Sequence, residues 1–159
     1  MLERGTWLVP TLAAPRAVLT AVAAGAALPA AVVDKARSVQ AAHDESVTRA
    51  VEAGVKVAMG TDSGVGPHGD NLSELALMAD CGMTPEQAWH ATTLSAAELL
   101  GVAGELGSLE PGKRADVVVL DGDARDLTGL PARVREVYRD GELVAAGGAV
   151  VEPGTIPPR

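Results

Sequence analysis

The pattern of apolar and polar positions is helical in the first part of the chain and strand-like near its end. Two short apolar stretches, 6–12 and 55–61, have the composition of buried strands. Between them, apolar positions recur every three or four residues and predict one face of a helix that ends at Gly54; this face is formed by Val32, Ala36, Val39, His43, Val47 and Ala50. A strand, a helix and a second strand in this order predict a βαβ unit.

Local signals mark the segments around this unit. Residues 1–5 look like the last turn of a helix with its glycine stop, so we expect a natural beginning further upstream. Residues 17–33 are uncharged and rich in alanine, which raises the alternative of a secretory leader. Gly25, Pro29 and the strand-like run before them do not fit a leader or a membrane span, so a loop and a weak helix are predicted there.

A loop and three short helices are expected after the second strand. Residues 63–69 are too rich in glycine for a regular element and predict an active-site-type loop that forms the best pocket candidate. Asn71 with Glu74 three residues later predicts a capped helix through Asp80, and 84–87 predict a capping box before the next helix. The third helix is expected over about 93–100 and ends at a glycine.

The period becomes strand-like after residue 104. Strands are predicted at 107–109, 115–120 and 134–138, and the last of these continues into 142–144 through the hairpin turn Asp140-Gly141. We therefore divide the chain into an α/β part over 1–103, a β module over 104–152 and a tail over 153–159 that is expected to be extended and frayed.

Composition and charge narrow the classes of function. The chain has 159 residues, which is one domain's length but well short of the roughly 250 residues of a complete eight-stranded α/β barrel. Its net charge of -8 argues against nucleic acid as a partner, because phosphate binding needs clustered Lys and Arg. The single cysteine, Cys81, predicts a small buried apolar residue in a reducing compartment, and thus a cytoplasmic protein.

The residue with the strongest chemical signal is Asp62. It directly follows the apolar run 55–61, and a carboxylate at the C-terminal tip of a barrel strand is a typical position for a catalytic group. The alternative is an aspartate that only caps the glycine-rich loop. A metal site around such a carboxylate needs further ligands, and the histidines of this chain, His43, His68 and His90, are too widely spaced to form a local ligand pair.

A series of motifs, in order along nearly the whole chain, resembles the C-terminal part of metal-dependent amidohydrolases of the imidazolonepropionase-like and prolidase-like branch. The motifs are Val9-Pro10-Thr11-Leu12, Gly54 to Gly64 with Gly60-Thr61-Asp62 inside it, His68-Gly69, Gly82-Met83-Thr84-Pro85, Ala91-Thr92-Thr93, Leu99-Leu100-Gly101, and Gly107 to Asp121. The resemblance implies a TIM (β/α)8 barrel, of which 6–12 and 55–61 would be the seventh and eighth strands, flanked by a β-sandwich built partly from the C-terminal strands.

The resemblance also implies a chemistry. In that family a divalent metal, commonly zinc, binds a water, and the carboxylate after strand eight ligates the metal and passes a proton from the water to the departing amine. Asp62 stands at that position. The family's remaining metal ligands would lie upstream of Met1, so a metal site in this chain alone is not expected.

The other candidate residues have two interpretations each. His68 follows the strand-eight loop and could donate a hydrogen bond to a small-molecule substrate, or could merely hold the loop. His43 is predicted to be a packed, hydrogen-bonded core residue and His90 a weak candidate, while Trp7 and Trp89 are predicted to pack. Lys113-Arg114 is predicted to be a solvated turn rather than an anion site.

Three hypotheses for the function follow. The first is a hydrolase of carbon-nitrogen bonds in amide, cyclic amide or dipeptide-like substrates, completed by a separately encoded N-terminal half or by a longer natural chain. The second is a catalytically inactive remnant or binding module, whose unpaired strand edges would drive self-association. The third, which no spacing in the sequence supports, is a metalloenzyme completed by oligomerisation.

Overall fold

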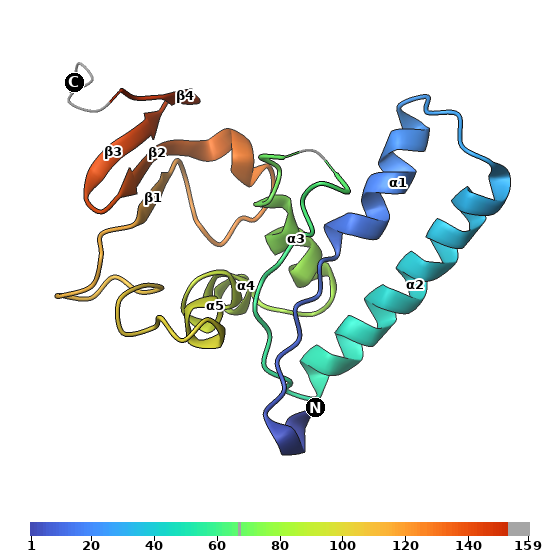
Figure 1. Cartoon of the computed structure of the whole chain (residues 1–159), viewed down its shortest axis with the longest axis horizontal. Helices are drawn as coiled ribbons and strands as arrows, with labels where there is room; N and C mark the ends of the chain where they lie inside the picture. The colour runs from blue at the N-terminus through green and yellow to red at the C-terminus, as the bar shows by residue number, and fades with distance from the viewer. Residues whose placement is uncertain (67, 153–159) are drawn as a thin grey trace.

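A computed structural model describes residues 1–66 and 68–152, so the predicted tail lies outside the described residues. A short 3-10 turn η1 (Leu2–Arg4) precedes the helices α1 (Ala13–Ala23), α2 (Ala30–Glu52), α3 (Ser73–Asp80), α4 (Pro85–Thr92) and α5 (Leu94–Leu99). Helices α1 and α2 pack side by side at one side of the molecule, and α3 to α5 separate them from a sheet at the other side (Figure 1). No helix in the described part of the chain has the length and apolar content needed to span a membrane.

The two predicted strands of the βαβ unit lie side by side, but they pair at only one position. The Leu8 N–H donates to the Lys56 carbonyl at 2.8 Å and the Ala58 N–H donates to the Leu8 carbonyl at 3.0 Å, which forms a parallel bridge between Leu8 and Val57. The next hydrogen bond of a parallel ladder would need the N–H of residue 10, and Pro10 has none. The parallel arrangement therefore agrees with the prediction, whereas neither run is a regular strand.

The prediction of a loop and a weak helix over 17–33 was wrong for its first half. Helix α1 occupies Ala13–Ala23, and Pro15 lies in its first turn, where a missing N–H leaves no hydrogen bond unmade. A short turn then leads into α2, which was predicted correctly and ends two residues before Gly54. Glycine 54 has a φ of 74°, the left-handed conformation that terminates helices.

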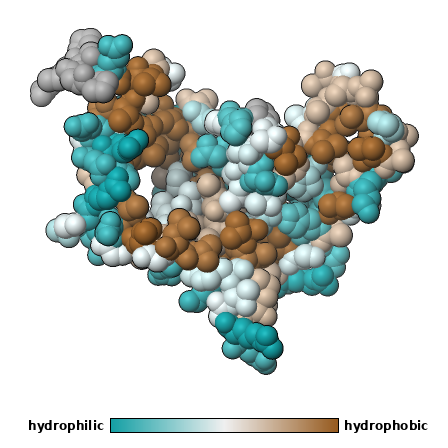
Figure 2. Space-filling model, in the orientation of Figure 1, coloured by the Kyte–Doolittle hydropathy of each residue, from teal (hydrophilic) through white to brown (hydrophobic). Residues whose placement is uncertain are grey.

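The core joins the helices to the C-terminal part of the chain through Leu127 and Leu130. Leu12, Leu75, Met78 and Leu130 are each fully buried and belong to one cluster with Val47, Val57, Cys81, Ala88, Ala91 and Leu127. Cys81 is 2% exposed, as predicted for a small buried apolar residue. Hydrophobic residues also reach the surface over the sheet and near the α1–α2 turn (Figure 2), where Val118, Val150, Leu28 and Val32 are all exposed.

Both tryptophans are half-buried, and Trp89 packs against the core cluster. The Lys56 ammonium lies 5.0 Å from the centroid of the Trp7 ring, a cation–π distance. The Trp89 indole N–H donates to the Ala124 carbonyl at 2.7 Å and so attaches α4 to the segment that follows residue 120. These contacts agree with the predicted packing role of the two side chains.

One of the two predicted helix caps is present. At α4, the Thr84 side chain accepts from the Gln87 N–H and the Gln87 side chain accepts from the Thr84 N–H, which completes the predicted capping box. The predicted cap of Asn71 and Glu74 was wrong: α3 begins after Leu72 without a side-chain cap. The Glu74 carboxylate instead points away from its own helix terminus, to the partners described below.

The C-terminal sheet is antiparallel, with the order β1 (Val117–Leu120), β2 (Val134–Arg139), β3 (Glu142–Ala146) and β4 (Ala149–Val150). The predicted hairpin joins β2 to β3, and its turn residues Asp140 and Gly141 have φ values of 52° and 81°, as a two-residue turn with both central φ positive requires. Arg114 forms two hydrogen bonds to the Asp140 carboxylate, at 2.5 and 2.7 Å. Strand β4 was not predicted, since it contains only two residues.

The predicted strand at 107–109 is absent from the sheet, because Gly107 packs against α5. A Cβ at this position would lie 2.8 Å from the Ala97 Cβ and 3.0 Å from the Leu94 Cα, and Gly107 has a φ of 92°. Both the close contact and the backbone conformation exclude a side chain. The segment is thus a close-packed connection between the helices and the sheet.

We expect Gly107→Ala to destabilise the fold by about 2–4 kcal/mol, because it adds a steric clash to a left-handed backbone strain. The measurement is the free energy of unfolding in urea. Gly104→Ala is the matched control, since Gly104 has no positive φ and an added Cβ would meet no atom within 4 Å. Equal effects of the two substitutions would contradict the packing described here.

Candidate functional site

The candidate site lies where the two paired segments end. Residues 9–12 and 58–62 continue past the Leu8–Val57 bridge in the same direction, so Thr11 and Asp62 both follow the carboxyl ends of parallel segments. Gly60 allows this close approach, because a Cβ there would clash with the Val9 Cγ1. Binding sites in parallel α/β folds are built at this end of the strands.

A cleft of about 520 Å³ opens beside these ends, between α1 and the loop that follows Asp62. Small side chains of α1 form one wall and the loop with the start of α3 forms the other; the lining residues are Ala13, Arg16, Ala17, Thr20, Ala21, Ala24, Thr61, Ser63, Val65, Gly66, Asp70, Ser73 and Leu77. A Cβ on Gly66 would lie 3.2 Å from the Ala17 Cβ, so the loop and the helix approach closely. The predicted pocket at the glycine-rich loop is therefore present, with α1 as a wall that was not foreseen.

Asp62 is exposed at the start of this loop. Its φ of 52° is left-handed, a conformation that aspartate adopts more readily than most residues. Its neighbours Thr61 and Ser63 line the cleft and share a side-chain hydrogen bond of 2.7 Å. Asp62 itself is exposed to solvent between these two residues and is not one of the residues that line the cleft.

The structure does not bring the three histidines together. His68 is exposed in a turn of the loop, and no hydrogen bond joins its ring to Asp62 among the described residues. The prediction of His43 as a core residue was wrong: it is half-buried on α2, and the described part of the chain offers its ring no hydrogen-bond partner. His90 lies on the exposed side of α4, where its Nδ1 is 2.8 Å from the Ser95 hydroxyl.

The described residues do not by themselves form the donor set that a metal ion needs. Within residues 1–66 and 68–152, no group of three or more His, Cys, Asp and Glu side chains is arranged to hold a metal. A zinc or similar ion needs at least three protein ligands, and Asp62 is a single exposed carboxylate. The residues described here therefore do not by themselves fit the metal that the sequence resemblance implies.

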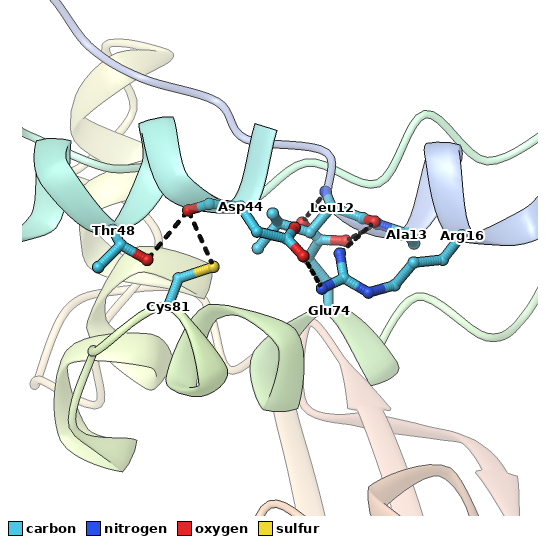
Figure 3. Close-up of polar contacts among 7 residues, drawn as sticks. All are labelled: Leu12, Ala13, Arg16, Asp44, Thr48, Glu74 and Cys81. Carbon is cyan, nitrogen blue, oxygen red and sulfur yellow. Dashed lines mark hydrogen bonds and ion pairs between the residues drawn. The ribbon is translucent and has the colours of Figure 1, made fainter. Parts of the chain in front are cut away.

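A buried carboxylate that was not predicted to be part of the site connects its two walls. Glu74, on α3, is completely buried, and its Oε1 and Oε2 accept hydrogen bonds from the N–H groups of Leu12 and Ala13 at 2.5 and 2.8 Å (Figure 3). These N–H groups begin α1 and have no acceptor within that helix. Burial raises the pKa of the Glu74 carboxyl, while the two N–H groups and the nearby Arg16 charge act in the opposite direction.

Arg16 extends this set of contacts to α2. Its guanidinium donates to the Leu12 carbonyl at 2.9 Å and to the Asp44 carboxylate at 2.8 Å. The Asp44 carbonyl in turn accepts from the Thr48 hydroxyl and from the buried Cys81 thiol (Figure 3), whose pKa is raised by burial. Helices α1, α2 and α3 are thus joined by polar contacts directly behind the cleft.

Sequence reasoning missed Glu74 because a glutamate three residues after Asn71 also fits a local capping box. The apolar neighbours Leu72, Leu75 and Leu77 were the available signal, since an acidic residue within such a run must be buried on at least one side. The partner, by contrast, is separated by 62 residues and could not be found from local spacing.

A model of the amidohydrolase family matches residues 1–144. The chain belongs to the amidohydrolase family. Among curated members, it is 37% identical to an imidazolonepropionase from Geobacillus kaustophilus over 110 residues, which cover 65% of this chain and 24% of that protein. It is also 45% identical to a putative N-acetylgalactosamine-6-phosphate deacetylase from Escherichia coli over 64 residues, 40% of this chain and 34% of the relative.

Solved structures of amidohydrolases agree with this assignment. A Xaa-Pro dipeptidase with methionine in its active site superposes with a TM-score of 0.81 at 36% identity, over 92% of this chain and 36% of that enzyme. An ochratoxinase from A. niger gives a TM-score of 0.73 at 29% identity, over 93% of this chain and 34% of the other. This amidohydrolase chain therefore spans about a third of the length of its structural relatives and about a quarter of the imidazolonepropionase.

Proposed function

We propose that this chain supplies one essential carboxylate to a hydrolase of carbon-nitrogen bonds. The observation that carries the proposal is Asp62, an accessible carboxylate at the end of a segment paired in parallel with 6–12, beside a cleft of about 520 Å³. Membership of a family whose relatives include an imidazolonepropionase, a deacetylase and a dipeptidase supports the bond type. The substrate is proposed to be a small amide, cyclic amide or dipeptide-like molecule.

In this proposal Asp62 moves a proton. Its carboxylate accepts a proton from the water that attacks the substrate carbonyl carbon, and it returns that proton to the nitrogen that leaves. The cleft walls, with the hydroxyls of Thr61 and Ser63, bind and orient the rest of the substrate. His68, on the same loop, is proposed as a hydrogen-bond donor to the substrate.

The family is generally metal-dependent, and the ligands missing from this chain are proposed to come from residues outside it. They would lie either in a separately encoded N-terminal part or in a longer natural chain, and the segments 6–12 and 55–61 would be the last two strands of the completed TIM barrel. The single bridge at Leu8–Val57 supports this, because each segment then has an edge free to pair with another strand.

Complementation tests the proposed function. The coding sequence upstream of the Met1 codon is read in all frames, and any encoded strand with a His-x-His pair is co-expressed with this chain. We expect hydrolysis of N-acyl amino acids, cyclic amides or X-Pro dipeptides only when both parts are present, and its loss when a chelator removes the metal. Each part alone is the control.

If no such part is encoded, or if the two parts form a complex without hydrolytic activity, the proposed function fails. The chain is then better described as an inactive remnant that binds copies of itself. The observation in favour of that alternative is the exposure of three apolar side chains in the N-terminal segment, Met1, Leu2 and Val9, which are between 43% and 56% exposed. Light scattering of the isolated chain distinguishes a monomer from such an oligomer.

A further inference from the structure

The loop that carries Asp62 is attached at both ends to the same short segment, 8–13. At its start, the Ala58 N–H donates to the Leu8 carbonyl at 3.0 Å. At its end, Glu74 accepts the N–H groups of Leu12 and Ala13. Asp62 lies between these two attachments, so its position depends on both.

Two residues inside this closed arrangement have an unfavourable backbone. Thr11 has a φ of 48° and Asp62 a φ of 52°, and a β-branched threonine is especially disfavoured in the left-handed region. Such conformations persist where surrounding contacts over-determine them. For Thr11, the contact that follows at once is the hydrogen bond from the Leu12 N–H to Glu74.

Packing alone does not account for a glutamate at this position. Its neighbour Leu75 and the next turn's Met78 already supply the buried apolar face of α3. A buried carboxylate loses its hydration and is favourable only where donors are aimed at it, as the two otherwise unbonded N–H groups of α1 are. The charge of Glu74 therefore has a specific target, the turn at Thr11 beside the candidate site.

We propose that Glu74 is a positioning residue of the active site: by binding the Leu12 and Ala13 N–H groups it holds the loop of Asp62 and the α1 wall of the cleft in one relative position. This inference rests on the proposed function for its catalytic consequence. The anchoring itself is a property of this chain and is testable without any activity.

Amide hydrogen exchange of the chain tests the anchoring. In the wild type, the amides of Leu12 and Ala13 are expected to exchange at least about tenfold more slowly than those of Ala30 and Ala31, because α2 begins without a side-chain cap. This comparison needs no variant and decides the question even if a substitution at Glu74 prevents folding. Equal exchange at the two helix starts would overturn the proposal.

Glu74→Gln then tests whether the anchor reaches the loop. A glutamine oxygen can accept one N–H, but its NH2 group would face the other donor, so one of the two bonds is lost. Exchange is expected to increase about tenfold at Leu12 or Ala13 and also at Gly64 and Val65, the two N–H groups within 61–66 that donate hydrogen bonds, and to stay unchanged at Leu75 and Met78. Faster exchange at the helix start without any change at Gly64 and Val65 would overturn the positioning role.

A double-mutant cycle in the completed enzyme tests the catalytic consequence. Glu74→Gln is expected to lower kcat about 10- to 100-fold with Asp62 present, because a displaced carboxylate transfers its proton poorly. In an Asp62→Asn background the same change should lower the residual rate by less than about twofold. Equal losses in both backgrounds would assign Glu74 to general stability and overturn the proposal, whereas an inactive wild-type complex would count against the proposed function and leave the exchange result standing.

Discussion

Asp62→Asn is expected to lower kcat/KM of the completed enzyme by about 10²- to 10⁴-fold, the range for loss of a positioned general base. Asparagine has nearly the same shape as aspartate and tolerates the left-handed backbone found here, with a φ of 52°. The exposed side chain makes no hydrogen bond in the described part of the chain, so the fold should keep its stability to within about 0.5 kcal/mol. The reaction would then lose its proton acceptor while the protein remains folded.

The measurement is steady-state hydrolysis by the complemented protein, with unfolding in urea as the check on folding. Asp80→Asn is the matched control, because Asp80 is an exposed aspartate at the end of α3, whereas Asp62 stands between Thr61 and Ser63, which line the cleft. We expect that control to keep wild-type activity. Full activity in the Asp62 variant would exclude the proton-transfer role, and with it the function proposed for this chain.

Leu130→Ala is expected to destabilise the protein by about 2–5 kcal/mol, as in other truncations of buried leucines. Leu130 begins the turn η2 (Leu130–Arg133) immediately before β2, is 0% exposed and belongs to the same cluster as Leu75 and Met78 of α3. Its removal leaves a cavity between the helices and the sheet. We therefore expect both parts of the chain to lose stability together.

Urea unfolding followed by tryptophan fluorescence and by far-UV circular dichroism provides the measurement. Both tryptophans lie within residues 1–103, whereas the far-UV dichroism reports the backbone structure of the whole chain. We expect the two unfolding curves of the variant to coincide and to have a lower urea midpoint than the curves of the wild type. Leu109→Ala is the control, since Leu109 is 80% exposed. A Leu130 variant that unfolds at the wild-type urea concentration, or in two separate steps, would contradict a shared core.

Local signals allowed correct predictions where the decisive partners are close in sequence. The Thr84–Gln87 capping box, the turn at Asp140 and helix α2 each depend on contacts within a few residues. Prediction failed where the deciding contact is distant or unusual. Helix α1 was not predicted over 13–16, and Pro10 prevents further pairing of the segment 6–12, although the composition of that segment favours a strand.

In the candidate site, too, the features set by neighbouring residues were predicted and those set by distant contacts were not. The apolar run before Asp62 led to its prediction as a site residue, which stays a prediction, and the loop after it was correctly expected to form a pocket. The opposite wall could not be predicted, because only a loop and a weak helix had been expected over 17–33, where most of α1 lies. Glu74 and its partners Leu12 and Ala13 come from segments far apart in the chain, so only the fold reveals that they meet.

The distance in sequence between Leu12 and Glu74 also sets the order in which the candidate site can fold during synthesis. Leu12 precedes Glu74 by 62 residues, so α1 leaves the ribosome long before the group that satisfies its first N–H groups has been translated. Until then the nascent α1 has free N–H groups at its start, and the turn at Thr11 has nothing to hold its left-handed backbone. The cleft therefore becomes complete only after α3 has emerged and docked, which makes the region around Asp62 a late product of folding on the ribosome.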